Sequence, residues 1–81
     1  MIKVFSKQMC PYCDKAKQLL EMWGFEYTEV KIDEDAAARE FCLEQGHRSV
    51  PQIYINETCL EGGYDGLSAA GKEQVTTLLE G

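Results

Sequence analysis

The order of predicted elements, β-α-β-α-β-β-α, indicates an α/β fold with a four-stranded mixed sheet flanked by three helices. The chain has 81 residues, of which 44% are hydrophobic and 10% aromatic, so we expect one globular domain over residues 1–81. Short runs with strand-like alternation take turns with longer runs at helical spacing. The last two strands follow one another directly, which predicts an antiparallel hairpin added to parallel strands.

The first strand and the first helix are predicted within residues 2–24. Residues 2–6 alternate between apolar and polar side chains, as a strand does. Pro11 suits the first position of a helix, where its missing N–H costs no hydrogen bond. Apolar residues then recur at helical spacing up to Trp23, and Gly24 is expected to end the helix.

The remaining elements are predicted to be a strand, a helix, two strands and a helix. Three acidic residues precede the second helix, where the helix dipole favours negative charge, and paired glycines precede the third. The expected bounds are 25–32 for the second strand, Ala36 to about Gln45 for the second helix, 51–55 and 58–60 for the hairpin strands, and Asp65 onward for the last helix.

The distribution of charge disfavours nucleic acid as a partner and marks the first part of the chain. The net charge is −6, yet residues 1–17 hold four lysines against one aspartate. A site near the first cysteines therefore has a basic surround that suits an anionic substrate. The chain opens on a strand pattern, not on a secretory signal, and no apolar run reaches the ~20 residues of a membrane span. We expect a cytoplasmic protein.

Two of the four cysteines form the sequence Cys10-Pro11-Tyr12-Cys13. A C-x-x-C pair near a βαβ pattern is a redox signature. Cys10 falls at the start of the first helix, where free N–H groups, the helix dipole and Lys7 favour a thiolate, so we expect a lowered pKa for this thiol. Cys13 shares the apolar face of the helix and is expected to be less exposed. We therefore predict that Cys10 attacks a disulfide and that Cys13 resolves the product.

A metal site is the competing interpretation of the C-x-x-C pair. Structural zinc normally needs a second ligand pair at a defined spacing. Cys42, Cys59 and His47 do not provide one, so no metal is expected. We predict that Cys42 is buried, that Cys59 is partly exposed in a strand, and that His47 lies at the surface or caps the second helix.

Almost the whole chain resembles the glutaredoxins. The C-P-Y-C motif is identical to that of dithiol members, and Lys7 stands where the family commonly has a basic residue. Residues 48–55 are similar to the family's Thr-Val-Pro segment and its following strand, with Ser49 in place of threonine. Residues 62–65 are similar to its Gly-Gly turn into the last helix.

The resemblance implies a thioredoxin fold and reduction of protein disulfides and glutathione mixed disulfides with electrons from glutathione, which is a co-substrate and not a bound cofactor. It implies that Pro51 is cis, that the Val50 backbone pairs with the cysteine of glutathione, and that Tyr12 lines the groove. Backbone N–H groups near Tyr64 are expected to hold the γ-glutamyl carboxylate. The implied glutathione-binding residues are Lys7, Tyr12, Arg48, Ser49, Val50, Pro51, Tyr64 and Asp65, of which Lys7 and Arg48 face the glycyl carboxylate.

Two departures from the family pattern concern the γ-glutamyl end of this groove. Gly66 stands where the family usually has an acidic residue, and Glu61 is an extra residue before the Gly-Gly turn. These departures leave open a redoxin that thioredoxin reductase reduces. An iron–sulfur carrier, with a cluster shared by two Cys10 thiolates and glutathione, is a further alternative. We expect a monomer, and the resemblance suggests ribonucleotide reductase among the protein substrates.

Overall fold

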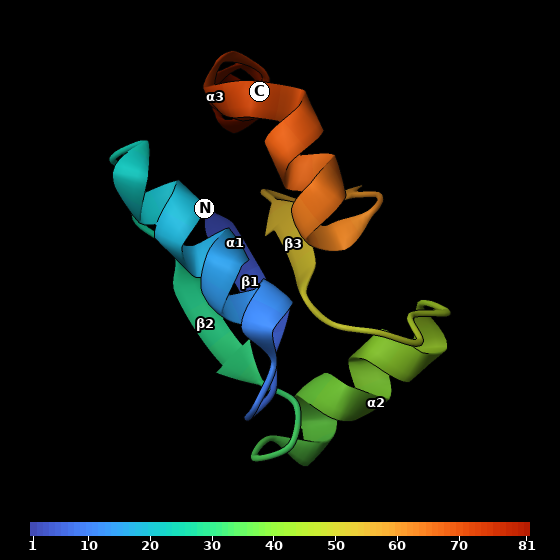
Figure 1. The fold of residues 1–81 in the computed structure, drawn as a ribbon. Helices are drawn as coiled ribbons and strands as arrows, with labels where there is room; N and C mark the ends of the chain where they lie inside the picture. Colours follow the sequence, from blue (N-terminus) through green and yellow to red (C-terminus); the bar gives the residue numbers. More distant parts are fainter.

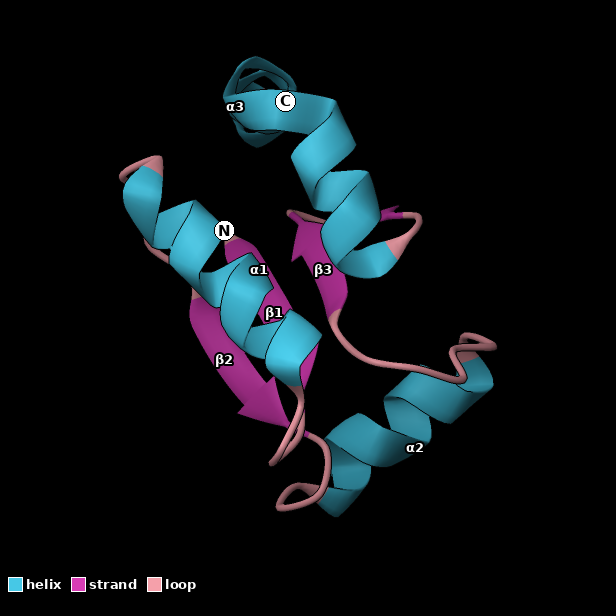
Figure 2. Ribbon diagram, in the orientation of Figure 1, coloured by secondary structure: helices cyan, strands magenta, loops and turns pink.

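The computed structural model describes residues 1–81 and contains four strands and three helices in the predicted order (Figure 1). The sheet order is β2-β1-β3-β4, with β1 and β2 parallel and the other two pairs antiparallel. Figure 2 labels the first three of these strands, β2, β1 and β3. The predicted α/β class and mixed sheet are confirmed. The elements are β1 (Ile2–Ser6), α1 (Pro11–Met22), β2 (Thr28–Lys31), α2 (Ala36–Glu44), β3 (Gln52–Ile55), β4 (Thr58–Leu60) and α3 (Gly63–Glu80).

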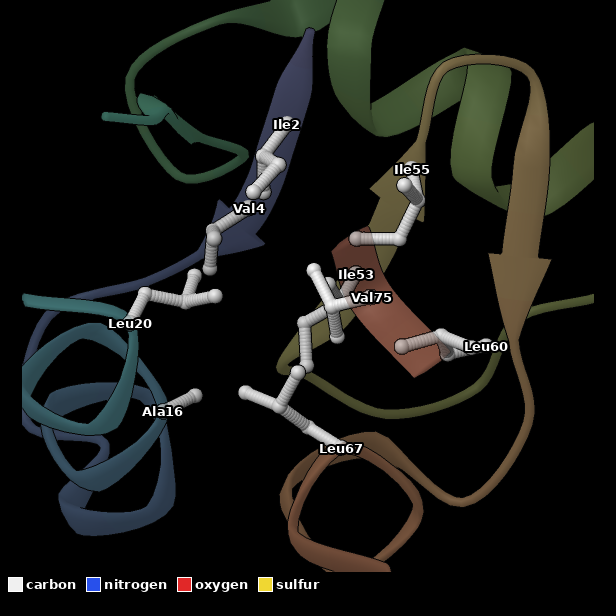
Figure 3. Packing of buried hydrophobic residues seen from close by; sticks show 9 residues of the cluster. All are labelled: Ile2, Val4, Ala16, Leu20, Ile53, Ile55, Leu60, Leu67 and Val75. Carbon is white, nitrogen blue, oxygen red and sulfur yellow. The ribbon is translucent and has the colours of Figure 1, made fainter. Parts of the chain in front are cut away.

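The hydrophobic core lies between one face of the sheet and the helices α1 and α3 (Figure 3). Alternation along the strands turns every second side chain of β1 and β3 toward this face. Burying one such aliphatic side chain stabilises the fold by about 1.5–3 kcal/mol. The core residues are Ile2, Val4, Ala16, Leu20, Ile53, Ile55, Leu60, Leu67 and Val75.

The opposite face of the sheet carries aromatic residues and meets α2. Phe5 of β1 and Tyr54 of β3 alternate with core residues and therefore point away from the core. The Phe41 ring of α2 stacks on the Phe5 ring, with centroids 5.5 Å apart, and lies 5.8 Å from the Tyr54 ring. α2 is thus attached to the sheet through an aromatic cluster.

The predicted helix ends of α1 and α2 are confirmed. Gly24 follows α1 with a φ of +82°, and Gly46 follows α2 with the same value, a conformation that glycine adopts without steric cost. Asp35 caps the start of α2 because its side chain accepts a hydrogen bond from the Ala38 N–H at 3.1 Å.

The predicted starts of β2, β3 and α3 are wrong. β2 begins at Thr28, not at residue 25, because the Phe25 N–H donates to Leu20 O at the end of α1. β3 begins one residue after Pro51, which has no N–H to donate. α3 begins at Gly63 and is interrupted at Gly71, whose backbone (φ 80°, ψ 167°) is not helical. Figure 1 shows the two halves of α3 running in different directions.

Candidate active site

The cysteine pair lies at the start of α1 and is asymmetric. Cys10 is the N-cap residue, and its sulfur accepts a hydrogen bond from the Cys13 N–H at 3.2 Å. The two sulfurs are joined as a disulfide, with the Cα atoms 5.2 Å apart. Cys10 is 9% exposed and Cys13 only 1%. Cys13 is thus the less exposed of the two residues, as predicted. Cys10 is also largely buried, although a residue at a helix start is usually exposed.

The segment before β3 accounts for this cover. The Cys10 sulfur lies 3.8 Å from the carbonyl oxygen of Val50, forty residues further along the chain. The Val50–Pro51 peptide bond is cis, as the resemblance implies. The backbone of Val50 is therefore at the reacting sulfur, where a bound disulfide would meet it.

A groove of about 310 Å³ adjoins the pair, between α1, the segment before β3 and the start of α3. The rings of Tyr12 and Tyr64 lie 6.1 Å apart across it, and the Lys15 ammonium lies 5.1 Å and 6.0 Å from their centroids. Six of the eight predicted glutathione-binding residues line it. The complete lining is Tyr12, Ser49, Val50, Pro51, Gln52, Gly62, Gly63, Tyr64 and Asp65.

Lys7 and Arg48, the other two predicted binding residues, line a second pocket of about 120 Å³ that shares Ser49 and Val50 with the groove. Arg39 of α2 is a third cation there, and no carboxylate lines this pocket. Arg39 was not among the predicted binding residues because it belongs to no motif. Arg39 lies three residues before the buried Cys42, so both are on one face of the helix. This spacing is the signal by which Arg39 could have been predicted.

Comparison with known proteins identifies the chain's family. The family model described as glutaredoxin matches residues 2–60, which include the cysteine pair and the Val50–Pro51 segment. The chain belongs to the glutaredoxin family. Glutaredoxin 3 of Escherichia coli K12 is 41% identical to it over 69 residues, which cover 84% of this chain and 82% of the relative. This glutaredoxin is accordingly a thiol–disulfide oxidoreductase.

Solved structures support the fold over nearly the whole glutaredoxin chain. The buckwheat glutaredoxin–glutathione complex superposes with a TM-score of 0.80 at 26% identity, covering 98% of this chain and 76% of the buckwheat chain. The thioredoxin-like protein BC3987 superposes with a TM-score of 0.73 at 28% identity, covering 98% and 100%. The predicted thioredoxin-like fold is confirmed. No helix of this glutaredoxin is both long and apolar enough to cross a membrane.

Gly66 and Glu61, the two positions at which the resemblance implies departures from the family pattern, approach each other closely. A Cβ atom on Gly66 would fall on the carbonyl oxygen of Glu61, well inside contact distance. The turn that contains Glu61 thus approaches the first turn of α3 so closely that only glycine fits at position 66. Asp65, one residue earlier, is the one acidic residue that lines the groove.

A charged cluster fixes α1 to the sheet behind the site. The Lys17 ammonium lies 2.8 Å from Glu29 Oε2, and the buried Ser6 hydroxyl donates to the same oxygen at 2.6 Å. The hydrogen bond from Lys17, with a second from Ser6, holds the pKa of Glu29 below its usual value, and the same ion pair raises the pKa of Lys17. Lys17 is therefore committed to the fold and does not serve the groove.

The other two cysteines lie on the α2 side of the sheet. Cys42 is buried and Cys59 half-buried, as predicted, and burial raises the pKa of both thiols. His47 caps α2 through its N–H, and its Nε2 lies 2.7 Å from the Tyr54 hydroxyl, a contact the sequence did not reveal. No group of three or more metal-ligating side chains is gathered anywhere in the chain.

Proposed function

We propose that residues 1–81 act as one glutaredoxin domain that reduces protein disulfides and glutathione mixed disulfides, with glutathione as the reductant. One observation carries the proposal. The Cys10 sulfur, at the N-cap of α1, lies beside Val50, and Val50 lines both the groove and the cationic pocket. The N–H hydrogen bond that this sulfur receives stabilises a thiolate more than a thiol, which favours Cys10 as the nucleophile.

The chemistry proceeds by successive thiol–disulfide exchanges. The Cys10 thiolate attacks one sulfur of the substrate disulfide, forms a mixed disulfide and releases the other sulfur as a thiolate, which takes up a proton. With a protein disulfide, the Cys13 thiolate then attacks the Cys10 sulfur, frees the reduced protein and leaves the Cys10–Cys13 disulfide. Two glutathione molecules reduce that disulfide and leave as oxidised glutathione.

Glutathione would lie along the groove with its two carboxylates at opposite ends. The likeness to the buckwheat glutaredoxin, whose structure was solved with glutathione, supports this placement. The pocket of Lys7, Arg39 and Arg48 suits the glycyl carboxylate because it holds three cations and no acid. At the other end, free N–H groups in the first turn of α3, near Tyr64, suit the γ-glutamyl carboxylate.

A redoxin reduced by thioredoxin reductase is the second candidate. It is favoured by the likeness to the thioredoxin-like protein BC3987 and by the glycine at position 66. A coupled NADPH assay separates the two functions. One arm contains glutathione and glutathione reductase, and the other contains thioredoxin reductase. Turnover in the first arm supports the proposal, and turnover in the second arm alone overturns the choice of glutathione.

The cellular setting is also a proposal. We place the protein in the cytoplasm, where a reducing environment keeps the free thiols Cys42 and Cys59 reduced. We further propose that it works as a monomer and that ribonucleotide reductase is among its protein substrates. Gel filtration and the same coupled assay with oxidised ribonucleotide reductase test these two statements.

A further inference from the structure

Met9, the residue before the nucleophilic sulfur, has a side chain that the fold does not use. It is 97% exposed, more than any other large hydrophobic side chain of the protein. Its φ is +56°, a left-handed conformation that is unfavourable for methionine and easily adopted by glycine or asparagine. Neither burial nor the backbone conformation explains a methionine at this position, so its apolar side chain is free for a role outside the fold.

A second exposed apolar side chain lies on the other side of Cys10. Tyr12 is 56% exposed, and its ring is held between Tyr64 and the Lys15 ammonium. Met9 and Tyr12 thus flank the reactive sulfur, and we call them the Met9–Tyr12 surface. Methionine adapts its shape to varied partners, and tyrosine offers a rigid ring at little entropic cost.

Charges of both signs lie near this surface: three exposed cations are free of ion pairs, Asp33 accepts a hydrogen bond from the Gln8 N–H at 3.1 Å, and Asp65 lines the groove beside Tyr12. Lys7, Lys15 and Arg48 are exposed and take part in no ion pair, whereas Asp14 is paired with Lys17 at 3.4 Å. The protein as a whole carries a net charge of −6. Lys7 and Arg48 also line the pocket that holds no carboxylate, so charge complementarity favours acidic residues of a partner on that side of Cys10.

We propose that the Met9–Tyr12 surface docks protein substrates whose disulfide lies in an acidic segment with an apolar residue beside the cysteine. This inference rests on the proposed oxidoreductase function and specifies its protein substrates. The apolar residue packs on Met9 while the sulfur approaches Cys10, and the acidic residues face Lys7 and Arg48. A small glutathione mixed disulfide, which occupies the groove alone, does not need Met9.

The test uses single-turnover reduction of short disulfide peptides by enzyme reduced beforehand with dithiothreitol, so that glutathione is not required. One peptide carries leucine beside the cysteine and glutamates around it; a second carries serine in place of leucine, and a third lysines in place of the glutamates. We expect M9G to lower the rate with the leucine–glutamate peptide about fivefold, the loss of one apolar contact. We expect M9L to keep the rate and added salt to slow the glutamate peptide most.

Two controls make the result specific. M22S removes another methionine that is 80% exposed, at the far end of α1, and is expected to change no rate. The mixed disulfide of glutathione and 2-mercaptoethanol is expected to react equally with wild type and M9G. The inference would be overturned if M9G lost the same rate on all substrates, or lost none with the leucine–glutamate peptide. It would also be overturned if the lysine peptide were reduced faster than the glutamate peptide, or if this surface were buried in a homodimer. No reduction of any peptide by the wild type would instead overturn the proposed function.

Discussion

The close approach of Glu61 to Gly66 gives a prediction whose sign depends on which of two effects is larger. Gly66 has an ordinary helical conformation in the first turn of α3, so replacing it with alanine should favour the helix by about 1 kcal/mol. The new Cβ, however, would meet the Glu61 carbonyl oxygen. That oxygen belongs to the backbone and cannot rotate away, as the end of a side chain could.

The steric effect is expected to win. Overpacking typically costs about 1–3 kcal/mol, and a backbone obstacle places this site near the upper end. The net expectation for Gly66→Ala is a loss of about 2 kcal/mol in the free energy of unfolding after the helix gain is subtracted. For a protein of this size, with a urea m-value of about 1 kcal/mol/M, the unfolding midpoint should fall by about 2 M.

Urea denaturation of three variants tests the reasoning. Ser68→Ala, at an exposed position of the same helix, measures the helix propensity gain alone and should raise stability by about 0.5 kcal/mol. Gly66→Ala combined with deletion of Glu61 should recover most of the lost stability, because the obstructing turn is shortened. If Gly66→Ala is as stable as Ser68→Ala, the Glu61 turn yields freely and does not require glycine at position 66.

Four further predictions address catalysis and stability. Cys10→Ser should abolish activity in the glutathione-coupled assay, while Cys13→Ser should keep reduction of glutathione mixed disulfides and lose that of protein disulfides; an active Cys10→Ser variant would contradict the assignment. Asn56→Ala should lower the free energy of unfolding in urea by about 2–3 kcal/mol. The Asn56 side chain donates to Leu78 O at 3.0 Å and accepts from the Met1 ammonium at 2.7 Å, and its φ of +56° is unfavourable for alanine. Asn56→Gly should cost less, because glycine adopts this φ freely. Folding lowers the pKa of Glu29, so the stabilisation by its carboxylate is present above about pH 4 and is lost as the pH falls further. In Glu29→Gln the free energy of unfolding should therefore decrease less steeply with falling pH below about pH 4. An unchanged pH dependence would contradict the role of the ion pair. Burial raises the pKa of Tyr54 to about 12, so stability should fall between about pH 10 and 12, and less steeply in Tyr54→Phe.

The sequence predicted those features whose causes are local. The N-cap at Cys10, the helix ends at Gly24 and Gly46 and the acidic start of α2 each depend on a few neighbouring residues. The burial of Cys13 followed from helical spacing alone. The resemblance, not the spacing, indicated the cis bond before Pro51 and the segments that line the groove.

The features that the sequence did not predict depend on contacts between distant segments. Arg39 joins Lys7 and Arg48 only because α2 is placed beside the loop that precedes α1. The bond between His47 and Tyr54 requires β3 to run past the end of α2. The kink at Gly71 is compatible with a continuous apolar stripe, so periodicity could not distinguish it from an unbroken helix.

The asymmetry of the cysteine pair follows from where α1 begins. Cys13 lies three residues before Ala16 and seven before Leu20, so all three belong to the stripe that the core buries. Cys10 lies one residue before Pro11, outside the helix, and its sulfur is positioned by the Cys13 N–H and the Val50 carbonyl. The core therefore fixes the resolving sulfur, whereas the N-cap and the segment before β3 fix the attacking one.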